Sequence, residues 1–164
     1  MSKPFKLKNG MRVHLAPFEG TEAMTALVLC KVGSRNEEKK ISGASHFIEH
    51  LMFKGTKKRP TTLDISRTLD GVGAEFNAYT GKNVTGYYIR IDSAHTDLAI
   101  DVLYDMLFHS KFDSKELNRE RGVVIEEINM YRDNPMMHVE DMLENIVFKG
   151  NSLGWEIAGD HKTM

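Results

Sequence analysis

The sequence is poor in several features that would place it in a particular protein class. It has one cysteine, Cys30, so no disulfide can form within the chain, which suits a reducing compartment. Lysine and arginine (22) nearly balance aspartate and glutamate (23), which gives no support for a polyanionic partner such as nucleic acid. No apolar run approaches the length of a transmembrane helix, and residues 1–5 lack the apolar core of a signal peptide. These absences favour a cytoplasmic protein with no membrane partner.

What is present is an ordinary globular composition. The 164 residues are 41% hydrophobic and 27% charged, which fits one domain with a sizeable core. The sequence stops at Gly159–Met164 without a finished element, so we expect residues 1–164 to form a single, incomplete domain. Cys30 lies in the apolar stretch Ala26–Val32, and we interpret it as a small buried hydrophobe in a strand buried on both faces.

Periodicity predicts alternating strands and helices. Asn9-Gly10 and Gly81–Asn83 are typical of hairpin turns, and Ser42 is a candidate cap for the first helix. The expected strands cover 5–8, 11–16, 26–32, 74–80 and 84–92. The expected helices cover 44–54, 63–69 (capped by Thr61 or Thr62), 98–107, 114–131 (capped by Asp113 or Ser114) and 137–148. This order predicts an α+β fold with helices packed on a mixed, largely antiparallel sheet.

A short basic run follows the first expected helix. Its members are Lys54, Lys57, Lys58 and Arg59. Runs of this kind are usually solvated, so we predict a hydrated loop here.

The most informative stretch is His46–His50, which reads His-Phe-Ile-Glu-His. On a helix, residues four apart share a face, so His46 and His50 can direct their imidazoles at one ion. Glu49 lies on the same side, close enough to act on a water at that ion. Zinc suits two imidazoles, a third protein ligand and an open position for water. The order His-x-x-Glu-His inverts the zincin motif and is itself a recognised signature.

The third ligand has to come from another part of the chain. On the helix expected over 114–131, Glu120 and Glu127 are seven residues apart and lie on one flank of the apolar face. Glu126 points to solvent, and Glu116 is also interpreted as solvated. Helical periodicity therefore favours Glu120 or Glu127 and does not choose between them.

Taken together, several ordered segments resemble the pitrilysin-like peptidases, the family of insulin-degrading enzyme and mitochondrial processing peptidase. The resemblance is nearest to bacterial members of the processing-protease type and runs along nearly the whole chain. The segments that carry it are Asn9–Val13, Gly33–Arg35, His46–Thr56, Phe76–Thr80, Glu120–Ile128 and Asp133–Pro135. It implies the metallohydrolase fold of the processing peptidases.

The resemblance also implies a set of roles. Glu127 would be the third ligand of one zinc ion per chain, and Glu120 would support the site from outside the ligand set. Glu49 would act as general base in peptide hydrolysis. Asn77 and Ala78 would contact the backbone of a peptide or unfolded polypeptide that adds to a sheet edge as an extra strand.

Members of this family enclose their substrate between two related halves. The second half supplies an arginine–tyrosine pair, and no residue of this chain can be assigned to it. The resemblance therefore implies a second homologous half or subunit as partner, because this chain matches only most of the first half.

Two other interpretations account for part of this pattern. S-ribosylhomocysteine lyases share a His-x-x-Glu-His helix, but their third ligand is a cysteine downstream of it, whereas Cys30 lies upstream. The second alternative is a non-catalytic, metal-binding half that acts as a peptide-binding or assembly partner. The complete motif favours the zinc endopeptidase.

Overall fold

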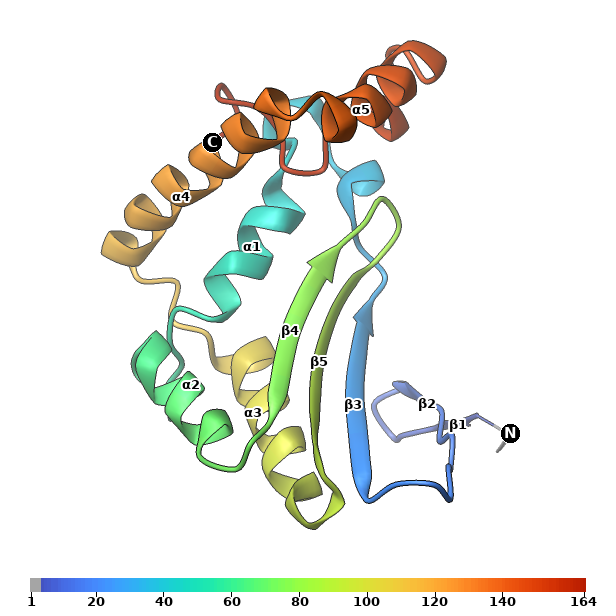
Figure 1. Cartoon of the computed structure of the whole chain (residues 1–164), viewed down its shortest axis with the longest axis vertical. Coiled ribbons are helices and arrows are strands. Elements are labelled where there is room, and N and C mark those ends of the chain that lie inside the picture. The colour runs from blue at the N-terminus through green and yellow to red at the C-terminus, as the bar shows by residue number, and fades with distance from the viewer. Residues whose placement is uncertain (1–3) are drawn as a thin grey trace.

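The computed structural model describes residues 4–164 and is built around a three-stranded antiparallel sheet (Figure 1). The central strand is β5, and the strand order is β3-β5-β4. A separate two-stranded hairpin, β1-β2, has the turn at Asn9-Gly10 between its strands. The strand bounds are β1 Phe5–Lys6, β2 Arg12–Val13, β3 Ala23–Cys30, β4 Glu75–Thr80 and β5 Thr85–Asp92.

Helices lie on one face of this sheet. Helix α3 contacts β5 and β3, while α1 contacts both β4 and α4, so α1 lies between the sheet and α4 (Figure 1). The α-helix bounds are α1 Ala44–Met52, α2 Thr62–Asp70, α3 Thr96–His109, α4 Ser114–Asp133 and α5 Pro135–Val147. The predicted α+β class with an antiparallel sheet is confirmed. No helix among residues 4–164 is long and apolar enough to cross a membrane.

The core fills the space between the sheet and its helices. Side chains of β5 interleave with those of α2 and α3, where apolar positions recur with helical spacing. The innermost members are Ile65, Leu69, Ile89, Ala99 and Val102, each no more than 1% exposed. Thr61 caps α2: its side chain and that of Asp64 each accept a hydrogen bond from the other residue's backbone N–H. Asp113 caps α4. Both residues were among the predicted caps.

Strand β3 is not buried on both faces, so that prediction was wrong. Leu27 and Leu29 are 48% and 56% exposed, whereas Val28 and Cys30 pack against the core. The physical reason is that helices cover one face of the sheet only, so alternate residues of β3 face solvent. Cys30 is partly buried rather than fully enclosed.

The predicted cap of the first helix was also wrong. Ser42 does not cap α1: the N-cap is Gly43, which has φ of 95° and no side chain to offer. Instead, the Glu37 carboxylate accepts hydrogen bonds from the backbone N–H groups of Gly43 and Ser45, both at 2.7 Å. A carboxylate six residues upstream thus satisfies amides that the first turn leaves unpaired.

The basic run is not simply a hydrated loop. Lys57 and Lys58 are exposed, but Arg59 donates to the buried Asp105 at 3.0 Å and to Asp101 at 2.8 Å. Lys58 also pairs with Asp101. These contacts tie the segment after α1 to α3, because the buried carboxylate of Asp105 requires a cationic partner.

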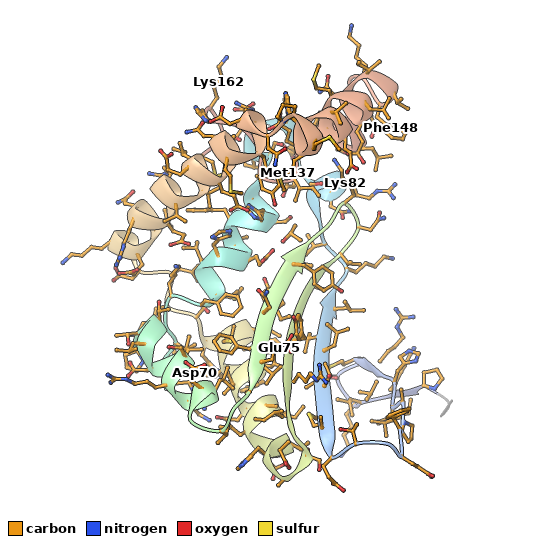
Figure 2. The ribbon with its side chains drawn as sticks, viewed as in Figure 1. Asp70, Glu75, Lys82, Met137, Phe148 and Lys162 are labelled. Atoms are coloured by element: carbon orange, nitrogen blue, oxygen red, sulfur yellow. The ribbon has the colours of Figure 1, made fainter. Side chains whose placement is uncertain are left out.

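The far end of the β4–β5 hairpin is anchored to the C-terminal region. Lys82, at the hairpin tip, lies beneath α5 (Figure 2). Its ammonium group donates to the Trp155 carbonyl at 2.6 Å and pairs with Glu144 of α5 at 2.8 Å. The sheet is thereby connected to the segment that follows α4.

Candidate metal centre

Helix α1 brings two imidazoles together. His46 and His50 are one helical turn apart, and their Nε2 atoms lie 3.3 Å from each other. Their side chains are 13% and 21% exposed, so both nitrogens are largely shielded from bulk water. The pair faces α4 because α1 packs against that helix.

Glu127 of α4 completes a cluster of three donors. Its Oε1 lies 3.6 Å from His46 Nε2, and its Oε2 lies 3.2 Å from His50 Nε2. Among residues 4–164, these three side chains form the one group with donor atoms converging closely enough to hold a metal ion, and Cys30 is not part of it. A tetrahedral zinc with ligands at about 2.0–2.1 Å separates its donor atoms by roughly 3.3 Å. The observed separations fit zinc.

The charge of the cluster also suits a cation. Hydrogen bonds from His46 and then His50 lower the pKa of Glu127 to about 2, which keeps its carboxylate ionised. Contact with Glu127, and to a lesser degree with Glu120, raises the pKa of His50, while burial opposes that shift. An ionised carboxylate between two imidazoles is a ligand set that zinc favours.

Glu120 lies behind His50, on the side away from Glu127. Its Oε1 is 2.9 Å from His50 Nδ1, and the side chain is only 4% exposed. Lys54 contacts the other oxygen, Oε2, at 2.7 Å. Sequence reasoning placed Lys54 in a hydrated loop and missed this contact. Its position four residues after His50 was the available signal.

Glu49, on the same helix, contacts the end of the edge strand β4. Its Oε2 accepts a hydrogen bond of 2.5 Å from Thr80 Oγ1 at the end of β4. The Glu49 carboxylate is therefore anchored to the last residue of the edge strand. Sequence reasoning did not single out Thr80 for this position, although Thr80 ends the matched segment Phe76–Thr80.

Asn77 and Ala78 lie in β4, which is paired only with β5 among the described residues. The Asn77 side chain is exposed, and its Oδ1 accepts a hydrogen bond from the Ala78 backbone N–H. A hollow of about 250 Å³ lies beside this strand. Its lining side chains are Phe53, Thr62, Ile65, Ser66, Phe76 and Asn77.

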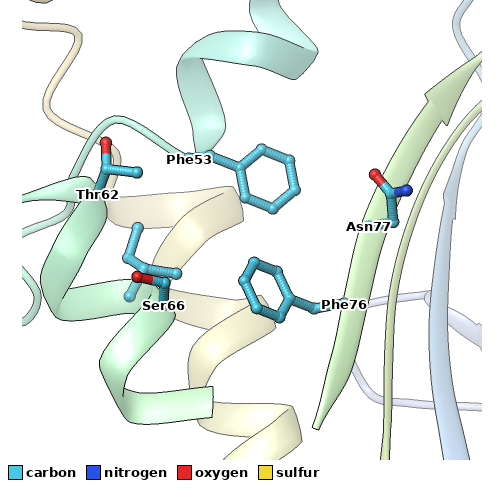
Figure 3. A pocket seen from close by; sticks show the side chains of 6 residues that line it. Phe53, Thr62, Ser66, Phe76 and Asn77 are labelled. Atoms are coloured by element: carbon cyan, nitrogen blue, oxygen red, sulfur yellow. The ribbon is translucent and has the colours of Figure 1, made fainter. Parts of the chain in front are cut away.

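Two of these rings define the hollow. Phe53 follows α1 directly and Phe76 comes from β4, and their rings point towards each other with centroids 6.2 Å apart (Figure 3). The hollow therefore connects the end of α1 with the edge strand. An apolar lining of this kind suits an apolar side chain.

Comparisons with known proteins agree with this geometry. A family model described as Insulinase (Peptidase family M16) matches residues 12–161. The chain is 40% identical to the uncharacterized zinc protease YmxG of Bacillus subtilis, over 100% of this chain and 40% of that protein. It is 39% identical to the mitochondrial-processing peptidase subunit beta of Caenorhabditis elegans, over 93% of this chain and 33% of that protein.

A solved structure is similar as well. The crystal structure of a protease from Helicobacter pylori superposes with a TM-score of 0.90 and 30% identity, covering 96% of this chain and 38% of that one. The chain thus spans about two fifths or less of the length of these three proteins.

Proposed function

The chain belongs to the insulinase family of peptidases (M16), and on that premise we propose that it is the catalytic part of a zinc-dependent endopeptidase. The observation that carries this proposal is the convergence of His46, His50 and Glu127 at separations that fit a tetrahedral zinc ion. Zinc is also the metal in the names of its bacterial relatives from Bacillus subtilis and Streptomyces coelicolor.

In this proposal His46, His50 and Glu127 hold the zinc ion. Bound zinc supplies a Lewis acid that lowers the pKa of a water and polarises the scissile carbonyl. Glu49 accepts the proton of the attacking water and returns it to the leaving amine. The hydrogen bond from Thr80 holds the Glu49 carboxylate in place, so that its other oxygen is available for the proton.

The substrate is proposed to be a peptide or an unfolded polypeptide. An extended chain would pair with the free edge of β4 at Asn77 and Ala78, where a strand can be added to the sheet. Thr80 lies three residues after Asn77 in the same strand, about 10 Å away. A bound strand would therefore run directly past Glu49. The hollow between Phe53 and Phe76 would accept an apolar side chain of that strand.

A second homologous half or subunit is the proposed partner. The relatives are longer than this chain by more than a factor of two, and one of them is named as a subunit. The arginine–tyrosine pair that the resemblance implies would have to come from that second half. Full activity is proposed to require both.

The test combines metal binding with peptide cleavage. The purified protein, loaded with one equivalent of zinc, is incubated with a quenched fluorescent peptide library. Glu49→Gln should retain zinc and lose cleavage, whereas Glu127→Gln should lose zinc. Glu126→Gln is the matched control for Glu127→Gln because its side chain is exposed on the same helix.

Three results are informative. Cleavage that disappears with Glu49→Gln and with chelation supports the peptidase. Zinc binding without cleavage, even when a second half is supplied, supports the alternative of a non-catalytic peptide-binding partner. Absence of zinc binding by the unsubstituted protein would refute the central proposal.

A further inference from the structure

Lys54 makes a contact that neither the metal ligands nor the general base account for. Its ammonium nitrogen lies 2.7 Å from Glu120 Oε2, and its side chain is only 25% exposed. Its neighbours in the basic run behave differently, since Lys58 and Arg59 pair with carboxylates of α3. Lys54 is thus the member of that run directed at the candidate metal centre.

The carboxylate that it meets is almost completely enclosed. Glu120 is 4% exposed, and its two oxygens have different partners: Oε2 contacts Lys54 and Oε1 contacts His50 Nδ1. A buried carboxylate is costly unless a positive charge and hydrogen bonds compensate it. Without the ammonium group, Oε2 would lose its ion-pair partner, and the carboxylate would be free to turn towards water. Such a turn would loosen the contact between Oε1 and His50.

That contact determines how His50 is presented. With Nδ1 bound to Glu120, the ring directs Nε2 at His46 and Glu127. His46 has no comparable support, because its Nδ1 is buried without a hydrogen-bond partner among residues 4–164. The orientation of the His50 ring therefore depends on the contacts that run from Lys54 through Glu120 to His50.

We propose that Lys54 is a positioning residue for the metal site: it neutralises and immobilises Glu120, which in turn holds His50 with Nε2 facing the ion. This inference rests on the proposed function for the identity of the ion. Lys54 touches neither a ligand atom nor the reacting groups. Its effect should therefore appear in metal affinity and depend on Glu120.

Zinc dissociation constants measured by competition with a chromophoric chelator test the proposal. Loss of a partner outside the ligand set typically weakens metal binding by about 10- to 100-fold. We expect Lys54→Met to weaken zinc binding by at least about tenfold, and Lys54→Arg to restore it to within about threefold. Lys58→Met is the control, because Lys58 belongs to the same basic run but pairs with Asp101. It should change the zinc dissociation constant by less than about twofold. Wild-type affinity in Lys54→Met would overturn the proposal.

A double-substitution cycle identifies the route of the effect. Because Lys54 acts through Glu120, Lys54→Met should change zinc affinity by less than about twofold in a Glu120→Gln background. Fully additive losses would overturn the proposal. If Lys54→Met alone does not fold, recovery of folding when Glu120→Gln is added supports the charge compensation, and failure to recover contradicts it. Wild-type protein that binds no zinc would refute the proposed function itself, which is a separate result.

Discussion

The Glu37 carboxylate holds the first turn of the helix that carries the histidine pair, and its removal should have a measurable cost. In the structure it accepts two hydrogen bonds of 2.7 Å, from Gly43 and Ser45, whose backbone groups are buried. Losing an N-cap typically costs about 0.5–2 kcal/mol, and loss of the negative charge at a helix N-terminus adds about 0.3–1 kcal/mol. We expect Glu37→Ala to lower the free energy of unfolding by about 1–3 kcal/mol.

Two further variants separate the contribution of the Glu37 charge from that of its hydrogen bonds and provide a control. Glu37→Gln keeps one carbonyl oxygen as an acceptor but removes the charge, so we expect a loss of about 1 kcal/mol. Glu38→Ala is the matched control because Glu38 is 72% exposed and pairs only with the exposed Lys40, a contact worth about 0–1 kcal/mol. From most to least stable, the variants should rank Glu38→Ala, Glu37→Gln and Glu37→Ala.

Urea denaturation of the metal-free protein measures these differences directly. In thermal unfolding, a loss of about 1–3 kcal/mol corresponds, for a chain of this size, to a fall in Tm of roughly 2–12 °C. Zinc affinity should fall together with stability, since the first turn of α1 contains His46. Equal stability of Glu37→Ala and Glu38→Ala would refute the assignment of Glu37 as the cap.

Two further predictions concern the turn after α1 and the single thiol. Gly55 has φ of 118°, and a Cβ there would lie 2.4 Å from the Pro60 carbonyl oxygen, so Gly55→Ala should cost at least about 2 kcal/mol in urea denaturation. Gly10→Ala, at φ of 87° with open space around the Cβ, should cost about 1 kcal/mol, and equal losses would contradict the predicted clash. Burial raises the pKa of the Cys30 thiol, so at pH 8 it should be alkylated more slowly than a cysteine in an unstructured peptide, and its rate should continue to rise at higher pH. Equal rates for the two thiols at pH 8 would show that the thiol is not protected.

Local sequence features predicted much of the fold. The spacing of Val102, Leu103 and Met106 indicated α3, and the Thr61 and Asp113 caps placed the starts of α2 and α4 within a residue. The i, i+4 spacing of His46 and His50 was enough to expect paired imidazoles. These features depend on residues within one or two turns of each other, which is why single-sequence reasoning reached them.

Local periodicity does not reach features that depend on packing between distant segments, and the choice of Glu127 came from the family resemblance alone. Helical periodicity left Glu120 and Glu127 equivalent, because both lie on one flank of α4. The way α1 packs on α4 separates them, since it brings Glu127 to the Nε2 atoms and Glu120 to His50 Nδ1. Likewise, an apolar run such as that of β3 does not reveal that helices will cover one side of the sheet only.

The strand order β3-β5-β4 also has a consequence for solubility. Among residues 4–164, the three-stranded sheet has two edge strands, and natural proteins usually protect such edges with charges, proline or bulges. The eight residues of β3 include no charged residue and no proline, and those of β4 include a single charge, Glu75. With Leu27 and Leu29 also exposed on β3, this segment has the composition of an aggregation-prone strand. Unless another segment or partner covers it, β3 would favour edge-to-edge association between copies of the chain as concentration rises.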